Sequence, residues 1–129
     1  MEKRVFKRKI YDRIAEWKQR KNGSTALLIK GARRIGKSTI ATEFAKREYR
    51  SYIAIDFVKA LPEVKALFSE LDDLDYIFLR LQSIYGVKLY DRESVIIFDE
   101  VQKCPEARQA IKYLVEDGRY DYIETGSLL

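Results

Sequence analysis

The chain has 129 residues, of which 47% are hydrophobic and 35% are charged, and it carries a net charge of +5. These values fit one globular domain with a core of its own and exclude a disordered chain. One cysteine and no histidine exclude a disulfide framework and a zinc site of Cys and His ligands. The apolar runs are short and the charged N-terminus lacks a signal-peptide pattern, which predicts a cytoplasmic protein without a membrane span.

The positive charge is concentrated at the N-terminus, where residues 1–22 hold nine Lys and Arg residues against three acids, a net charge of +6. The same segment predicts a helix over residues 4–21, ended by Asn22 and Gly23, because apolar side chains recur at spacings of three and four. These side chains are Phe6, Ile10, Ile14 and Trp17. We interpret the segment as a packing helix whose basic residues face water, and a nucleic-acid-binding helix is the alternative.

Strands and helices alternate along the rest of the chain. Buried strands are predicted at residues 25–30, 51–57, 94–98 and 120–125, the first with the apolar pattern of a central strand. Helices are predicted at residues 37–49, at 62–86 with a break near Asp72 and Asp73, and at 105–117. This alternation is typical of an α/β fold, here three αβα layers around a mostly parallel sheet. Ligands of such sheets bind at the carboxyl ends of the strands.

The loop after the first strand carries the strongest functional signal. Residues 31–38 (GARRIGKS) match the phosphate-binding pattern G-x-x-x-x-G-K-[ST], between a strand and a helix. Backbone N–H groups of such a loop surround phosphates, Lys37 pairs with the β- and γ-phosphates, and Ser38 offers a hydroxyl to Mg²⁺. The predicted nucleotide-binding residues are Gly31, Ala32, Arg33, Arg34, Ile35, Gly36, Lys37, Ser38 and Thr39.

The third predicted strand ends in two acids, Asp99 and Glu100. At the carboxyl end of a strand that follows a phosphate loop, Asp99 is expected to hold Mg²⁺ together with Ser38. Glu100 is expected to accept a proton from the attacking water. An adjacent glutamate is typical of P-loop proteins that hydrolyse ATP, whereas Ras-like GTPases position the water with Gln. The sequence therefore favours ATP with Mg²⁺ as the ligand and ATP hydrolysis as the reaction.

Four segments together resemble the AAA-type ATPases that are widespread in bacteria and archaea. They are the phosphate loop, residues 52–56 (YIAID), residues 98–105 (FDEVQKCP) and residues 124–127 (ETGS). In that family the ATPase core is paired with a further, C-terminal domain. The resemblance spans nearly the whole chain and implies an additional-strand, catalytic-glutamate P-loop NTPase fold with strand order 5-1-4-3-2.

The resemblance also implies a sensor, which is a polar residue at the end of the fourth strand between the two acids and the γ-phosphate. Ser127 is the first choice for this sensor and Thr125 is the alternative. A plain turn after the strand is the competing interpretation. The predicted catalytic set is therefore Glu100, Lys37 and Ser127.

Residues next to these motifs have competing interpretations. Arg33 and Arg34 either reach the ligand or a partner subunit, or are solvated, which we favour. Asp56 is expected to be a turn or cap acid. Gln102 either contacts substrate water or a neighbour, or is solvated at a helix start. Cys104 is expected to be an inert thiol.

Two functions remain open at this point. The chain is an ATPase core, or it is a nucleotide-binding switch or interaction module with little hydrolysis of its own. The resemblance places a fifth strand, an arginine finger and a lid after the sensor, so we expect residues 1–129 to lack them and to turn over slowly. The expected partners are ATP, a second copy of the chain or a C-terminal domain, and nucleic acid only if the N-terminal helix binds it.

Overall fold

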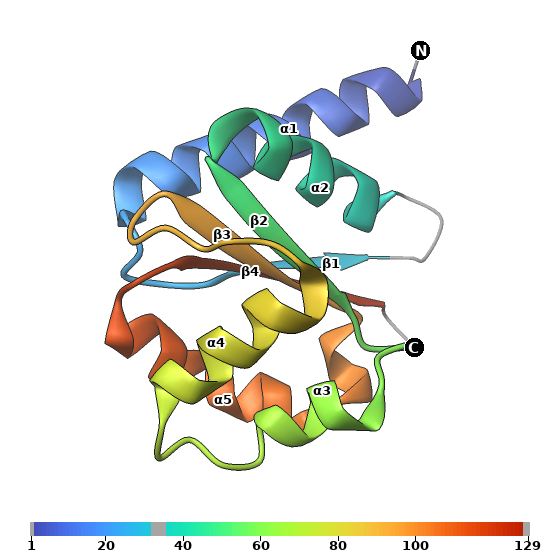
Figure 1. Ribbon diagram of the computed structural model, residues 1–129. Coiled ribbons are helices and arrows are strands. Elements are labelled where there is room, and N and C mark those ends of the chain that lie inside the picture. Colours follow the sequence, from blue (N-terminus) through green and yellow to red (C-terminus); the bar gives the residue numbers. More distant parts are fainter. Residues whose placement is uncertain (1, 32–35, 128–129) are drawn as a thin grey trace.

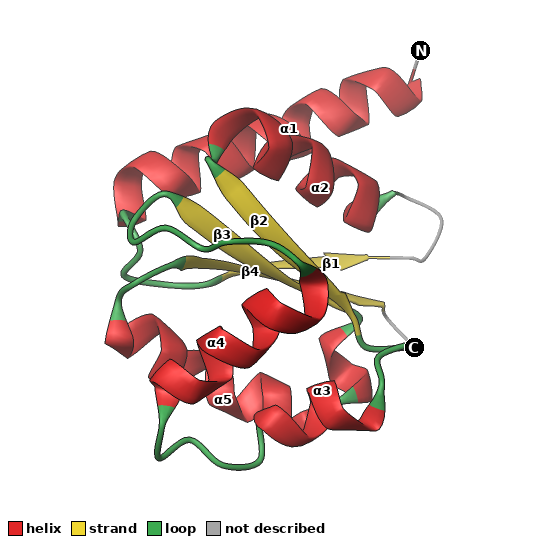
Figure 2. Cartoon of the chain, in the orientation of Figure 1, coloured by secondary structure: helices red, strands yellow, loops and turns green. Residues whose placement is uncertain are grey.

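The structure, a computed structural model, describes residues 2–31 and 36–127. Its helices and strands alternate along the chain as predicted (Figure 1, Figure 2). They are α1 (Glu2–Lys21), β1 (Leu27–Gly31), α2 (Lys37–Glu48), β2 (Ser51–Asp56), α3 (Pro62–Leu67), α4 (Leu74–Tyr85), β3 (Ser94–Asp99), the 3-10 helix η2 (Val101–Lys103), α5 (Pro105–Asp117) and β4 (Asp121–Ser127). The predicted α/β class is confirmed.

The described strands form one parallel sheet with the order β1-β4-β3-β2. This is the order 1-4-3-2 that the resemblance implies for the first four strands. β4 enters between β1 and β3, with Ile29 opposite Thr125 and Phe98 opposite Glu124. The carboxyl ends of β1, β3 and β4 therefore meet at one edge of the sheet, close to the start of α2 (Figure 1).

Helices cover both faces of the sheet, with α1 and α2 on one face and α3, α4 and α5 on the other (Figure 1). Alternate residues of β3 supply the two cores. Val95 and Ile97 belong to the cluster that contains the buried residues of α1 and α2. Ile96 and Phe98 belong to the cluster on the opposite face. A strand buried on both faces has no polar alternation, which explains the unbroken apolar run in this part of the sequence.

The N-terminal helix α1 packs beside α2 on the same face of the sheet, as its apolar pattern predicts (Figure 1). Ile14 and Trp17 are buried in the same cluster as Phe44 of α2. The indole N–H of Trp17 donates to the Thr25 carbonyl at 3.1 Å, which ties the end of α1 to the chain entering β1. Within the residues that the structure describes, no helix has both the length and the apolar character needed to cross a membrane.

Some elements differ from the sequence-based prediction. Among the described strands β1 pairs with β4 alone, so it is an edge strand and not the central strand that its apolar pattern predicts. β4 runs to Ser127, two residues beyond the predicted end, because its last residues still pair with β1. The helix η2 was not predicted. The predicted break in the segment 62–86 is confirmed, and Asp73 caps the following helix by accepting from the Tyr76 N–H at 3.1 Å.

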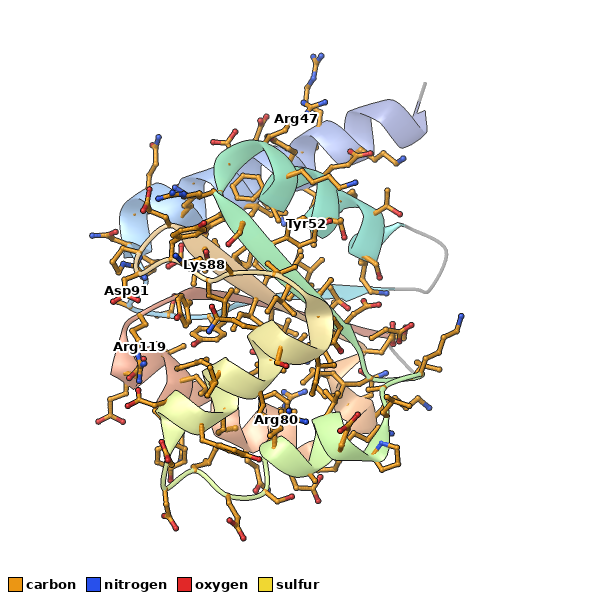
Figure 3. All side chains as sticks on the ribbon, in the orientation of Figure 1. Arg47, Tyr52, Arg80, Lys88, Asp91 and Arg119 are labelled. Carbon is orange, nitrogen blue, oxygen red and sulfur yellow. The ribbon has the colours of Figure 1, made fainter. Side chains whose placement is uncertain are left out.

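A buried acid, Asp121, lies at the amino ends of the strands, opposite to the carboxyl ends that carry the motifs. Arg119, labelled in Figure 3, lies at the same end of the sheet. Asp121, 4% exposed at the start of β4, accepts a hydrogen bond from the Tyr49 hydroxyl and one from Arg92 Nη2 at 2.7 Å. The Arg92 guanidinium fills the space where a side chain on Gly23 would stand, with Nη2 only 2.6 Å from a Cβ built there. Burial and the hydrogen bond to Asp121 raise the pKa of Tyr49, so this tyrosine stays a neutral donor.

We expect Asp121→Asn to lower the free energy of unfolding by about 1–2 kcal/mol, because it removes the charge of a buried acid whose arginine partner is 38% exposed. Urea denaturation followed by circular dichroism measures the change. The control is Glu16→Gln in the exposed pair with Arg20, whose side chains are 60% and 71% exposed. That control should change stability by less than about 0.5 kcal/mol. Equal midpoints for Asp121→Asn and the wild type would contradict a structural role for this pair.

Candidate active site

The phosphate-loop motif ends at the start of α2. Gly36 adopts the left-handed conformation with φ 75°, and its carbonyl accepts the Ile40 N–H at 3.0 Å, which begins the helix. Lys37 is only 3% exposed, and its Nζ donates to the Gly31 carbonyl at 3.0 Å. The buried Lys37 ammonium thus connects the start of α2 to the end of β1, which are the two ends of the loop. The predicted binding residues Ala32, Arg33, Arg34 and Ile35 lie outside the described residues.

Two hydroxyls converge on one carboxylate oxygen at the end of β3. Ser38 Oγ donates to Asp99 Oδ1 at 2.5 Å, and Thr125 Oγ1 donates to the same oxygen at 2.5 Å. The hydroxyl and the carboxylate that the sequence predicts to share Mg²⁺ are therefore already in contact. Hydroxyl and carboxylate oxygens are the ligands that Mg²⁺ prefers, and this ion usually takes one or two carboxylates together with phosphate oxygens. Ser38 and Asp99 fit that ion.

Glu100 is held more tightly than the sequence indicates. Its backbone adopts the left-handed conformation with φ 54°, and its N–H donates to Thr125 Oγ1 at 3.0 Å. The Ser127 hydroxyl donates to Glu100 Oε2 at 2.8 Å. The Ser127 N–H donates to Oε1 at 3.2 Å, and Gln102 Nε2 donates to Oε1 at 2.8 Å. A left-handed conformation is costly for a non-glycine residue and persists only where its surroundings enforce it.

The hydrogen bonds also decide the charge of Glu100. Burial alone would raise the pKa of this carboxyl. Hydrogen bonds from Gln102 and Ser127, together with the positive charge of Lys37, outweigh burial and hold the pKa of Glu100 below its ordinary value. The side chain is therefore a carboxylate at neutral pH.

The structure thus brings together the predicted residues Lys37, Ser38, Asp99, Glu100 and Ser127, at the carboxyl ends of β1, β3 and β4 and the start of α2. Thr39 stands in the first turn of α2 with its side chain exposed. The two sensor candidates divide their contacts. Thr125 touches Asp99, whereas Ser127 touches Glu100.

Other residues named from the sequence lie outside this cluster or differ from their interpretation. Asp56 is a turn acid, as predicted, because its carboxylate accepts the Val58 N–H at 3.0 Å. Cys104 is buried, and burial raises the pKa of its thiol, which agrees with an inert side chain. Gln102 is not a solvated residue. It contacts Glu100, and this contact depends on the left-handed turn at Glu100 before η2, for which the sequence carries no local pattern.

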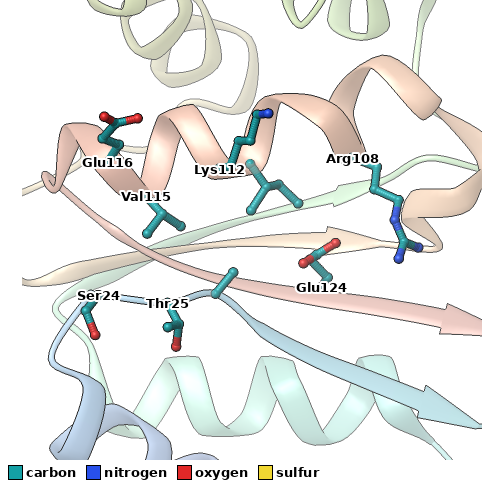
Figure 4. Close-up of a pocket in the computed structure, with 9 residues that line it drawn as sticks. Ser24, Thr25, Arg108, Lys112, Val115, Glu116 and Glu124 are labelled. Atoms are coloured by element: carbon teal, nitrogen blue, oxygen red, sulfur yellow. The ribbon is translucent and has the colours of Figure 1, made fainter.

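A groove of about 590 Å³ lies between α5 and residues 24–26, which lead into β1, away from this cluster (Figure 4). Glu124 of β4 lines it, and burial raises the pKa of this carboxyl while the charge of Arg108 opposes the shift. The groove shares no lining residue with the cluster around Asp99 and Glu100. The chemistry at the strand ends, and not the volume of this groove, therefore identifies the candidate site.

The basic helix α1 approaches the phosphate-loop end of α2. Lys7 Cε lies 3.9 Å from the position that a Cβ on Gly36 would occupy. Lys7 also lines a groove of about 290 Å³ between the two helices, together with Tyr11 and Arg47. Figure 3 shows Arg47 pointing away from the sheet. Part of the basic segment thus lies beside Gly36, just before α2, and nucleic-acid binding by this helix stays a prediction.

No curated protein matches the sequence. The family described as AAA domain matches residues 23–129, which is most of the chain and includes β1 to β4 with all the clustered side chains. The family indicates a nucleotide-binding, ATPase-like domain, in agreement with the fold and with the phosphate-loop motif. The chain therefore belongs to the AAA domain family.

Proposed function

We propose that the chain binds ATP with Mg²⁺ between the phosphate loop and the carboxyl ends of β3 and β4, and that it hydrolyses the ATP. The observation that carries the proposal is the 2.5 Å contact between Ser38 Oγ and Asp99 Oδ1. It joins the last residue of the phosphate-loop motif to the acid at the end of β3. The buried Lys37 and the carboxylate of Glu100 lie at the same edge of the sheet, as phosphoryl transfer to water requires.

Each side chain has a defined role in this proposal. Lys37 exchanges the Gly31 carbonyl for phosphate oxygens and neutralises part of their charge. Ser38 and Asp99 hold Mg²⁺, which, when bound, adds positive charge against the phosphate oxygens. Glu100 accepts the proton of the water that attacks the γ-phosphorus as the bond to the leaving ADP breaks. Ser127 places a hydroxyl between Glu100 and the γ-phosphate.

One observation favours the alternative function, a nucleotide-dependent switch with little turnover. Both carboxylate oxygens of Glu100 accept hydrogen bonds from Gln102 or Ser127. In the described arrangement these donors therefore stand where an attacking water would have to bind. Steady-state phosphate release by the wild-type chain at saturating ATP and Mg²⁺ separates the two functions. Sustained release supports the ATPase, and tight binding without release supports the switch.

We expect Asp99→Asn to abolish the dependence of ATP affinity on Mg²⁺. The wild-type chain should bind ATP at least about tenfold more tightly with Mg²⁺ than without it, because a carboxylate ligand anchors the ion. In the variant the two affinities should agree within about twofold, since the amide brings no charge to the ion. Calorimetric titration with ATP in Mg²⁺ and in EDTA measures both. Asp56→Asn, at the end of β2, is the matched control. A wild-type metal response in Asp99→Asn would place the ion elsewhere.

A further inference from the structure

Gln102 lies in η2, and its side-chain amide lies between Glu100, which follows β3, and Gly126 of β4. Its Nε2 donates to Glu100 Oε1 at 2.8 Å. Its Oε1 is buried without a hydrogen-bond partner among the described residues. The two ends of the amide are distinguished by chemistry, because the opposite orientation would place a carbonyl oxygen against a carboxylate. The contact with Glu100 thus keeps the amide in place although its oxygen is unsatisfied.

β4 leaves room for this amide at one residue. A Cβ built on Gly126 would stand 3.2 Å from Gln102 Oε1, which is closer than most contacts of this kind. Gly126 has no left-handed φ to explain the glycine. Close approach of the Gln102 amide is the requirement at this position. In β4, Gly126 therefore leaves room for the Gln102 amide, and the next residue, Ser127, donates to the same Glu100 carboxylate as Gln102 does.

The two oxygens of Glu100 are held by different kinds of donor. Oε1 accepts from a backbone N–H, which the sheet fixes, and from the Gln102 amide, which packing against Gly126 restrains. Among the described residues, Oε2 accepts from the Ser127 hydroxyl alone, and this hydroxyl can turn about the Cα–Cβ bond to another acceptor. A phosphate oxygen beside Ser127 would draw that hydroxyl away. Oε2 would then be open while Oε1 stayed fixed.

We propose that Gln102 is a positioning residue. It anchors Oε1 of Glu100, so that Oε2 can exchange the Ser127 hydroxyl for the attacking water as its hydrogen-bond partner. The inference rests on the proposed ATPase function and adds to it the residue that aims the base. It also explains why both oxygens of Glu100 accept hydrogen bonds from the protein in this structure. The three donors hold the carboxylate in its working direction before the nucleotide arrives, and only one of them has to leave.

The test uses side chains of similar size. Gln102→Met keeps the volume and loses the donor, and Gln102→Glu keeps an acceptor but sets a second carboxylate against Glu100. We expect kcat to fall about tenfold or more in Gln102→Met, and at least as far in Gln102→Glu, because a loosely held base is misaligned. ATP affinity by calorimetry and KM should stay within about twofold of the wild type, since Gln102 is not placed to touch the nucleotide. Lys103→Met, exposed on the same short helix, should match the wild type.

Two results would overturn the inference. One is wild-type kcat in Gln102→Met, which would reduce Gln102 to a packing residue. The other is a parallel loss of ATP affinity and kcat, which would indicate general damage to the site. A separate readout does not depend on turnover. In NMR spectra of the chain without nucleotide, Glu100→Ala should displace the side-chain NH₂ signals of Gln102, and Gln102→Met should displace the amide signal of Ser127.

The two failures are distinguishable. If the wild-type chain releases no phosphate, the proposed ATPase function fails, and with it the catalytic use of Gln102, whatever the spectra show. If the wild type turns over and Glu100→Gln does not, the ATPase stands, and the Gln102 variants alone decide the present inference. Unmoved signals in both NMR comparisons would refute the contact itself.

Discussion

We expect Lys37→Ala to weaken ATP binding, measured by calorimetry, by at least about a hundredfold relative to the wild-type chain. The physical reason is the position of Lys37, which is 3% exposed and whose ammonium donates to the Gly31 carbonyl at the first residue of the phosphate-loop motif. In the proposed complex a charge so far removed from water would interact strongly with the β- and γ-phosphates, and the alanine variant would lack that charge.

The matched control for this variant is Lys30→Ala. Lys30 is exposed on β1 and carries the same charge a short distance along the chain, so its loss alters the net charge equally. It should change ATP affinity by less than about threefold, because exposed charges are screened by salt. Circular dichroism and urea denaturation establish that Lys37→Ala is folded, since the variant also loses the contact with Gly31. Unchanged affinity in a folded Lys37→Ala chain would place the nucleotide elsewhere.

Much of the candidate site follows from the sequence because of the strand-end rule for parallel sheets. A glycine-rich motif after an apolar strand and two acids after another one are local patterns, and the sheet brings them to a common edge. The structure confirms the parallel sheet and its order, and it joins Ser38 to Asp99 across 61 positions of sequence. To predict that Ser38 and Asp99 lie close together, it is enough to know that the strands are parallel, and their detailed register is not needed.

The contacts around Glu100 could not be predicted in the same way. They depend on how far β4 extends and on its register against β3, where Phe98 lies opposite Glu124. That register places Thr125 beside Asp99 and Ser127 beside Glu100, and a shift by one residue would reverse the side of the sheet each one faces. The left-handed turn at Glu100 is equally hidden, because no local pattern favours it in a glutamate. The sequence leaves open whether Gln102 contacts a neighbour, because the turn at Glu100 that brings the two side chains together has no local signal.

The second large effect that we expect is the loss of turnover in Glu100→Gln. The substitution keeps the size of the side chain and one acceptor oxygen, so Ser127 and Gln102 retain a partner and the site keeps its shape. It removes the carboxylate to which Ser127 donates at the end of β4, and a neutral amide takes no proton from water. General-base catalysis contributes roughly a hundredfold to ten-thousandfold, so phosphate release should fall by at least about a hundredfold.

ATP affinity should meanwhile stay within about threefold of the wild type, because Glu100 acts on the water and the metal is assigned to Ser38 and Asp99. Glu70→Gln, an exposed acid remote from the strand ends, makes the same change of charge and should release phosphate at the wild-type rate. Phosphate release at saturating ATP and calorimetric titration of the same samples provide both quantities. Turnover that survives in Glu100→Gln would remove Glu100 from the chemistry and leave the hydrogen bonds of Ser127 and Gln102 as a structural clamp at the end of β4.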